Sequence, residues 1–191
     1  MGFPSPLTVA HRWVAERLQP GEIAVDATAG GGTDTLFLAK LSGRKGLVYA
    51  FDVQVEALEL TRRRLDGEAA PLANVSLIHG SHEQMEEEVP AALHGKAAAV
   101  MFNLGYLPGS DGTVITKPHS TLAALQSALK LLRSKGIITA VLYPGHPGGN
   151  EEAEAVEEWA AGLHPHEAEV LLYRFLNRAH TAPYLLGIIR K

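Results

Sequence analysis

Three glycines between two aspartates are the residues of this chain whose types and spacing most directly suggest chemistry. In the stretch VDATAGGGTD, Asp26 ends a short apolar run, Gly30 to Gly32 follow, and Asp34 stands at the start of a helix-like segment. Glycines let a ligand approach the backbone closely, and the free amides at a helix start attract anionic groups. A carboxylate at the same place favours a positively charged ligand instead. The stretch therefore predicts a nucleotide-like ligand, and its charge is the question to resolve.

The glycine spacing separates three classes of such ligands. A nucleoside triphosphate is bound by G-x-x-x-x-G-K-[ST], and no lysine follows these glycines. A nicotinamide or flavin dinucleotide requires G-x-G-x-x-G; Gly30 and Gly32 supply the first two glycines, but Thr35 stands where the third belongs. S-adenosylmethionine has positively charged sulfonium and ammonium groups and no phosphate, so it suits a loop that carries Asp34. We therefore predict S-adenosylmethionine as the cofactor.

A further carboxylate, Asp52, ends the next apolar run, 20 residues after Gly32, where it is placed to accept both ribose hydroxyls. The third apolar run ends near His79. If these runs are parallel strands of one sheet, the adenine of a nucleoside ligand lies beyond the end of this strand, so Ser81 or His82 is expected to contact the adenine edge. Helix capping is the alternative role for the aspartates, and a solvent-facing position is the alternative for His82. The predicted cofactor-binding residues are Asp26, Thr28, Gly30, Gly32, Thr33, Asp34, Thr35, Asp52, Gln54, Ser81, His82 and Asn103.

The absence of cysteine restricts the reaction. The chain has no cysteine, so it has no thiolate nucleophile, no cysteine-bound zinc and no cysteine-ligated iron–sulfur cluster. Methylation of a pyrimidine C5 usually needs that nucleophile, and radical methylation needs that cluster. Direct displacement onto a nitrogen or oxygen lone pair remains. No set of histidines has zinc-ligand spacing either, so we predict no metal.

Alternating apolar runs and helical patterns place these residues on one edge of a sheet. The sequence predicts helices over 5–18, 33–41, 54–65, 120–132 and 151–163, an acidic helix within 81–93, strands over 22–28, 46–52, 74–80, 96–106 and 135–149, and a final antiparallel pair over 167–177 and 182–191. Such alternation is typical of a mostly parallel sheet with helices on both faces. Ligands of such sheets bind beyond the carboxyl ends of the strands, which is where the polar residues named above lie.

Several motifs together resemble a known family. VDATAGGGTD resembles the first motif of class I S-adenosylmethionine-dependent methyltransferases, with Thr28 in place of the first glycine of D-x-G-x-G-x-G, and AFDVQ resembles the second. More narrowly, DATAGGGTDTLFLA, FDVQ, NLGYLPGSD and GHPGG resemble the YtqB/MnmM-type group, labelled rRNA methylases, which includes the tRNA 5-(aminomethyl)-2-thiouridine methyltransferase. The resemblance implies a Rossmann-like fold with a seven-stranded sheet, and a homodimer that acts on the wobble uridine of the tRNA anticodon stem-loop.

The loop after the fourth apolar run is the predicted catalytic segment. FNLGY (102–106) resembles the N-P-P-Y loop of amino-group methyltransferases, in which an asparagine side-chain oxygen and the next backbone carbonyl accept hydrogen bonds from the amine. A tight turn after a strand is the alternative. An alkylamine is protonated at neutral pH, so a base or desolvation must favour its neutral form. The predicted catalytic residues are Asn103, Leu104, Tyr106, which would flank the base, and Asp111 or His146 as proton acceptor.

The charged residues give a weaker indication of where RNA binds. The net charge is −4, so only local clusters can contact phosphates. The predicted RNA-binding residues are Lys117, His119, Arg174, Arg178 and His180, whereas Arg62 to Arg64 are expected to form a solvated helix end.

Length and composition bound the remaining predictions. A chain of 191 residues with 46% hydrophobic residues suits a single domain, 1–191, with an N-terminal helix (1–20) packed on it. No apolar run reaches the roughly 18 residues that a membrane helix needs, and we predict a cytoplasmic protein. The predicted function is RNA amine N-methylation at the tRNA wobble uridine. A small-molecule or protein N-methyltransferase, an rRNA methyltransferase, a cofactor-binding domain without catalysis and, last, a dehydrogenase are the alternatives.

Overall fold

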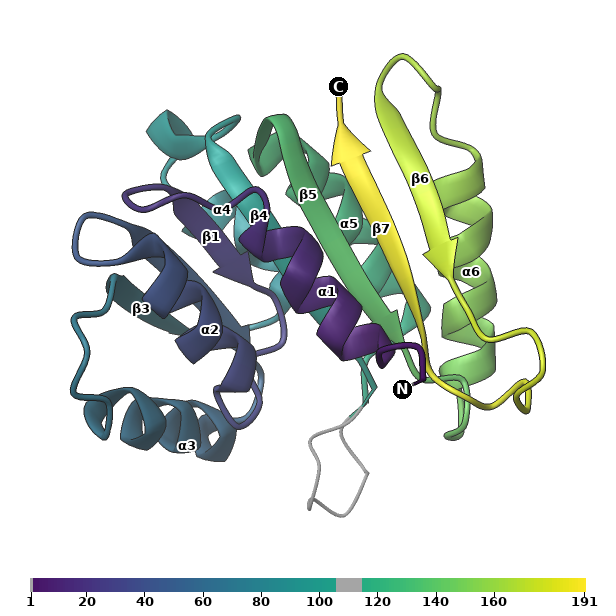
Figure 1. The fold of residues 1–191 in the computed structure, drawn as a ribbon, viewed down its shortest axis with the longest axis horizontal. Coiled ribbons are helices and arrows are strands. Elements are labelled where there is room, and N and C mark those ends of the chain that lie inside the picture. The colour runs from purple at the N-terminus through teal and green to yellow at the C-terminus, as the bar shows by residue number, and fades with distance from the viewer. Residues whose placement is uncertain (1, 106–114) are drawn as a thin grey trace.

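Seven strands form one mixed sheet in the computed structural model, which describes residues 2–105 and 115–191 (Figure 1). The strand order is β3-β2-β1-β4-β5-β7-β6; β1 to β5 pair in parallel, and β7 is antiparallel to both β5 and β6. The predicted fold class is confirmed, including the C-terminal antiparallel pair. The strands are β1 (Ile23–Asp26), β2 (Leu47–Asp52), β3 (Asn74–His79), β4 (Ala97–Leu104), β5 (Leu132–Leu142), β6 (Ala168–Tyr173) and β7 (Tyr184–Arg190).

Helices cover both faces of the sheet, as Figure 1 shows. Apolar residues of α1 and α2 pack on one face together with strand residues such as Ala24, Met101 and Val141. Residues of α4, α5 and α6 pack on the other face around Phe102 and Ile138. The helices are α1 (Pro6–Ala15), α2 (Thr33–Ser42), α3 (Val55–Asp66), α4 (Met85–Glu88), α5 (Pro118–Leu131) and α6 (Gly149–Ala161), with short 3-10 helices η1 (His82–Gln84) and η2 (Ala91–Leu93).

Helix α1 precedes the alternating strands and helices and lies across β5 and β7. Its start is capped because the Ser5 side chain accepts a hydrogen bond from the Thr8 amide, and Pro6 occupies the first turn. The Trp13 ring fills the space over Gly187: a Cβ on Gly187 would lie 2.7 Å from Trp13 Cζ3. This close approach holds α1 in one position on the sheet.

Two predicted elements differ from the structure. The acidic segment 81–93 is η1, the single turn α4 and η2 rather than one helix, because Pro90 interrupts it and three adjacent glutamates follow Met85. Strand β5 runs from Leu132 to Leu142 instead of over 135–149. A register irregularity between Ala97 and Ala99 accommodates the added residues, and Lys135 adopts a positive φ of 62° there.

The strand order reverses direction around β1, which lies between β2 and β4. A sheet of this kind opens a crevice at the carboxyl ends of the strands that flank the reversal. Among the described residues, no helix is both long and apolar enough to cross a bilayer.

Candidate cofactor and acceptor site

A cavity of about 560 Å³ opens at the carboxyl ends of β1, β2 and β4. This volume lies within the range of small-molecule sites. Of the predicted cofactor-binding residues, those that line it are Thr28, Gly30, Thr33, Asp52, Gln54, Ser81, His82 and Asn103. The described residues around it include one carboxylate, from Asp52, and neither lysine nor arginine. A pyrophosphate would find no cationic partner among them, whereas a positively charged nucleoside such as S-adenosylmethionine fits.

The glycine loop forms the floor of this cavity. Gly30 and Gly32 have φ angles of 52° and 77°, a conformation that side chains other than glycine adopt at a cost. Gly30 lines the cavity, but Gly32 faces α3: a Cβ there would lie 2.7 Å from Thr61 Cα. The two glycines therefore act differently, because Gly30 admits a ligand and Gly32 admits a neighbouring helix.

Asp26 is buried beneath the loop and does not line the cavity. One of its carboxylate oxygens accepts a hydrogen bond from the Thr28 amide at 3.1 Å, and the other accepts one from the Thr35 hydroxyl at 2.6 Å. Burial, together with the neighbouring Asp34 carboxylate, raises the pKa of Asp26 to about 7. Asp26 and Thr35 thus brace the glycine loop from inside.

Asp52 ends β2 and faces the cavity. Its Oδ2 accepts a hydrogen bond from the Gly30 amide at 2.8 Å, and its Oδ1 accepts one from the Gln54 amide at 2.9 Å. Each carboxylate oxygen can accept a second hydrogen bond, so both remain able to bind hydroxyl groups. The carboxylate is held by the backbone on both sides and is ready to accept from a ribose.

His82 is buried against the same cavity rather than facing solvent. Its Nδ1 lies 3.2 Å from the Ala27 carbonyl oxygen. A carbonyl only accepts, so Nδ1 donates and Nε2 is the nitrogen with the lone pair. Burial lowers the pKa of His82, which favours the neutral ring. Ser81 caps η1 by accepting from the Glu83 amide at 3.4 Å.

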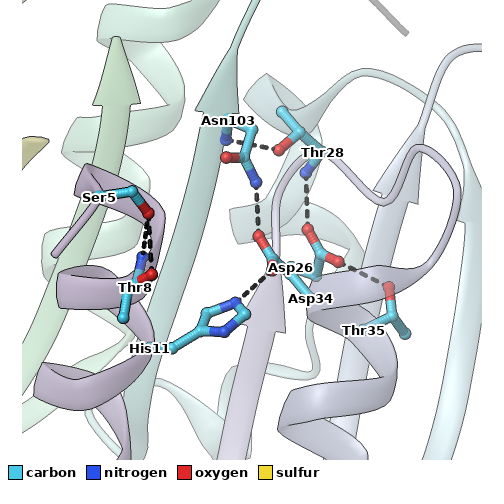
Figure 2. A network of polar contacts seen from close by, with 8 residues as sticks. All are labelled: Ser5, Thr8, His11, Asp26, Thr28, Asp34, Thr35 and Asn103. Atoms are coloured by element: carbon cyan, nitrogen blue, oxygen red, sulfur yellow. Dashed lines mark hydrogen bonds and ion pairs between the residues drawn. The ribbon is translucent and has the colours of Figure 1, made fainter. Parts of the chain in front are cut away.

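A chain of side-chain hydrogen bonds reaches Asn103, as Figure 2 shows, through residues that do not line the cavity. Asn103 Nδ2 lies 2.5 Å from Asp34 Oδ2, and His11 Nε2 lies 2.6 Å from Asp34 Oδ1. The Asn103 backbone amide donates to the Thr28 hydroxyl at 2.7 Å. Asp34 is almost fully buried and does not line the cavity, and His11 belongs to α1. Sequence reasoning missed His11, because nothing in the local pattern of α1 links it to Asp34.

The remaining predicted catalytic residues lie around the loop after β4. Leu104 is the buried last residue of β4, whereas Tyr106 and Asp111 lie outside the described residues. His146 Nδ1 lies 3.0 Å from the Pro147 carbonyl oxygen. A Cβ on Gly105 would lie 3.6 Å from the His146 Nε2, so His146 adjoins the start of the loop without lining the cavity.

The far end of the same loop is fixed by a buried glutamate that sequence reasoning also missed. Glu152 of α6 accepts hydrogen bonds from the Thr116 and Thr121 hydroxyls, both at 2.6 Å. The Thr116 amide in turn donates to the Gly105 carbonyl at 3.0 Å. Tyr143 directly follows β5 and lines this side of the cavity. Burial, and to a smaller extent the negative charge of Asp34, raises the pKa of the Tyr143 hydroxyl. Only the tertiary contacts identify these residues.

The predicted RNA-binding residues lie on two exposed segments. Lys117 and His119 stand at the start of α5, where His119 lies 3.9 Å from Glu83. Arg174, Arg178 and His180 belong to the connection between β6 and β7. This connection lies at the carboxyl edge of the parallel strands, because β7 begins opposite the end of β5. In the described parts of the chain, no three histidine or acidic side chains gather in a metal-binding group.

Comparisons with known proteins agree with this architecture. A family model described as "Putative rRNA methylase" matches residues 48–189. A chloroplastic tRNA (mnm(5)s(2)U34)-methyltransferase from Arabidopsis thaliana is 38% identical over 190 residues, which cover 96% of this chain and 68% of that protein.

Two solved structures are similar over their whole length. One is described as a "putative rRNA-methylase" from Clostridium thermocellum, with a TM-score of 0.93, 36% identity and complete coverage of both chains. The other is a methyltransferase from Streptococcus mutans in complex with SAH, with a TM-score of 0.87, 34% identity and the same coverage. The chain therefore belongs to the "Putative rRNA methylase" family of S-adenosylmethionine-dependent methyltransferases, which confirms the family, the cofactor and the enzyme class predicted from its sequence.

Proposed function

We propose that the protein methylates the exocyclic amine of 5-aminomethyl-2-thiouridine at the tRNA wobble position and produces 5-methylaminomethyl-2-thiouridine. The observation that carries the proposal is the orientation of Asn103. Its side-chain nitrogen is bound to Asp34, so its oxygen is the side-chain atom left to accept a hydrogen bond at the cavity. An acceptor of this kind suits an amine nucleophile. The similarity to the Arabidopsis tRNA methyltransferase supports the choice of tRNA.

In this reaction, the residues of the chain bind the cofactor and align the substrate amine with it. Asp52 and the glycine loop hold the cofactor, which supplies an electrophilic methyl group when bound. Asn103 Oδ1 accepts a hydrogen bond from the substrate amine and aims its lone pair at that methyl carbon. The nitrogen–carbon bond forms as the carbon–sulfur bond breaks, and the new secondary ammonium then releases a proton. Such alignment of two bound groups can lower a barrier by about 7–11 kcal/mol.

The substrate amine must lose a proton before it can attack. A free alkylamine has a pKa near 10, like that of lysine, so it is charged at neutral pH. The sulfonium charge and the partly apolar cavity both favour the neutral amine. His146 is the described candidate for the proton acceptor, because an imidazole titrates in the neutral range and a Cβ on Gly105, at the start of the loop, would lie 3.6 Å from its Nε2. Asp111 is the second candidate and lies outside the described residues.

We propose that the β6–β7 connection contacts the RNA beside the target nucleotide. The Arg178 guanidinium lies 3.9 Å from the centre of the Phe175 ring, and the Phe3 ring meets Phe175 edge-on. Arg178 makes no ion pair with the described residues, so its outer face is available to a base or a phosphate. Stacking and phosphate contacts of this kind are usual for RNA segments that are already single-stranded.

The family resemblance implies a homodimer, and we propose that the two copies associate through the surface around the edge strand β6. Leu171 and Leu172 of β6 are 58% and 37% exposed, which is unusual for large apolar side chains on an unpaired strand edge. Light scattering should give twice the mass of one 20.4 kDa chain, and Leu171→Asp should shift the protein to a single chain. A wild-type monomer at micromolar concentration would contradict this assembly.

One assay separates the candidate functions. The protein is incubated with methyl-labelled S-adenosylmethionine and tRNA that ends its modification at 5-aminomethyl-2-thiouridine, and the tRNA is digested to nucleosides. Label in 5-methylaminomethyl-2-thiouridine is the expected result. Label in ribosomal RNA would favour the rRNA methyltransferase alternative, which the family description suggests. Cofactor binding with no label in either RNA would favour a small-molecule or protein substrate. A tRNA substrate agrees with the cytoplasmic location predicted from the sequence.

A further inference from the structure

Asp34 occupies a position from which it can control the catalytic asparagine without touching the cofactor. Its side chain is almost fully buried and is absent from the cavity lining. Both carboxylate oxygens are engaged by side chains, one by Asn103 Nδ2 at 2.5 Å and the other by His11 Nε2 at 2.6 Å (Figure 2). The sequence suggests that this carboxylate attracts the positively charged cofactor directly. The contacts indicate a different role.

A carboxylate behind Asn103 determines which end of the amide faces the cavity. Because a carboxylate only accepts hydrogen bonds, the amide nitrogen must point toward it and the amide oxygen must point away. A flipped amide would place its oxygen against Asp34 Oδ2 and would lose this charge-assisted bond. The bond also draws electron density toward Asn103 Oδ1, since hydrogen bonds in a chain polarise one another. Asp34 therefore makes this oxygen a stronger and a correctly directed acceptor.

His11 holds the other side of Asp34 and comes from a separate part of the fold. It belongs to α1, and its ring stacks on Phe37 of α2 with centroids 4.1 Å apart and planes 11° apart. Its Nε2 must carry a hydrogen, because the partner is a carboxylate. The stacked ring cannot turn freely, so the carboxylate is fixed between two donors. The packing of Trp13 over Gly187 keeps α1, and with it His11, in place.

We propose that Asp34 and His11 are positioning residues that present the Asn103 amide oxygen to the substrate amine. This inference rests on the proposed function. During transfer, positive charge leaves the sulfur and develops on the attacking nitrogen. A fixed carboxylate behind Asn103 stabilises that charge through the amide, and a preorganised dipole needs no rearrangement at that moment. The substrate class that such a device serves is a primary amine, whose hydrogens Asn103 can accept.

The first test uses single variants of Asp34 and His11, a control variant and one double variant of the full chain. Asp34→Asn leaves a side chain of equal size that can offer its own NH₂ to a flipped Asn103, so kcat should fall about 100-fold. His11→Ala should lower kcat about 10-fold, and His11→Gln, which keeps an N–H donor, should restore part of that loss. Cofactor Kd, measured by calorimetry, should change less than about twofold in all of them. The exposed Asp66→Asn, on α3, is the matched control and should retain full activity.

The double variant tests whether the residues act as one unit. Asp34→Asn combined with Asn103→Ala should be no slower than Asn103→Ala alone, because Asp34 acts only through Asn103. Losses that multiply would overturn the proposal. So would an Asp34→Asn enzyme that binds the cofactor more than about tenfold more weakly yet keeps its kcat when saturated, since that result makes Asp34 a cofactor contact.

A second measurement does not depend on the substrate. The side-chain NH₂ signals of Asn103 are assigned in a ¹⁵N-labelled sample by their absence in Asn103→Ala. One of the two protons should resonate downfield of the other asparagine side chains and should lose this shift in Asp34→Asn but not in Asp66→Asn. An unshifted signal in the wild type would refute the hydrogen bond. If the wild type methylates no tRNA while this shift is present, the proposed function fails and the positioning of Asn103 stands.

Discussion

Asp34 and Asp52 are aspartates near the starts of α2 and α3, but their carboxylates have different partners and different exposure to the cavity. Within the described chain, Asp52 accepts hydrogen bonds from backbone amides and faces the cavity. Asp34 is bound by side chains and lies buried behind Asn103. A carboxylate held by backbone amides keeps lone pairs for a ligand, whereas one enclosed by two donor side chains transmits its charge through them. In the proposed function, the site thus has a cofactor half whose carboxylate is held by backbone amides and an acceptor half whose carboxylate is held by side chains.

The largest expected effect is on the acceptor half. Asn103→Ala removes the oxygen that aligns the amine, and kcat should fall about 100- to 1,000-fold. Cofactor Kd should remain within about threefold, because Asp52 and the glycine loop are intact. Single-turnover methyl transfer measured with labelled cofactor checks the first value and calorimetry checks the second. Wild-type turnover in this variant would remove Asn103 from the mechanism.

The converse variant should affect the cofactor half. Asp52→Ala removes both acceptors proposed for the ribose and the bonds to the Gly30 and Gln54 amides, so cofactor Kd should rise about 30- to 150-fold, from about 2–3 kcal/mol of lost interaction. At saturating cofactor, kcat should recover to within about tenfold of the wild type. A kcat loss as large as that of Asn103→Ala, with unchanged Kd, would erase the distinction between the two halves.

A change far from the cavity should damage only the acceptor half. Gly187→Ala places a Cβ 2.7 Å from Trp13 Cζ3, so the Trp13 ring must move, and we expect α1, which carries His11, to move with it. Thermal unfolding should show a loss of about 1–3 kcal/mol. At a temperature where the variant is folded, kcat should fall several-fold while cofactor Kd stays the same. A matching loss in cofactor affinity would mean that α1 supports both halves.

The third carboxylate, Asp26, should give the smallest effect and a distinct pH signature. Its pKa is about 7 in the folded chain, above its ordinary value of 3.8, so between these values the folded state binds more protons than the unfolded state. The free energy of unfolding contributed by Asp26 therefore falls as pH rises from about 4 to about 7 and is level above that. In Asp26→Asn, urea unfolding at several pH values should lack this decline.

At neutral pH the same substitution should cost less than about 1 kcal/mol. The amide that replaces the Asp26 carboxylate keeps an oxygen for the Thr28 amide, and its NH₂ can donate to the Thr35 hydroxyl. A pH dependence equal to that of the wild type would assign the proton to another group near the loop, of which Asp34 and Asp52 are the nearest carboxylates.

The elements built from local patterns were predicted well. Apolar runs bounded by glycine or aspartate correctly indicated β1 to β4 and the final strand pair, and the spacing from Gly32 to Asp52 indicated a nucleoside cavity that both loops now line. Segment 81–93 was wrongly predicted as a single helix. Repulsion between its glutamates and the ring of Pro90 oppose a continuous helix there, whereas the burial of Met85 favours a helical turn. The start of β5 was misplaced because an irregular pairing with β4, not a local signal, extends it.

The sequence by itself determined the fold class and the cofactor, because apolar periodicity and the glycine-aspartate motif are patterns of residues close together in the chain; it also predicted the glycine loop and Asn103 as site residues. Tertiary structure alone decided that Asp34 binds Asn103 and does not line the cavity, that His11 reaches Asp34 from α1, and that Glu152 binds the Thr116 hydroxyl. The physical reason is that a side chain's role depends on which donors and acceptors surround it. For these three residues, partners as far as 69 positions away in the chain supply them.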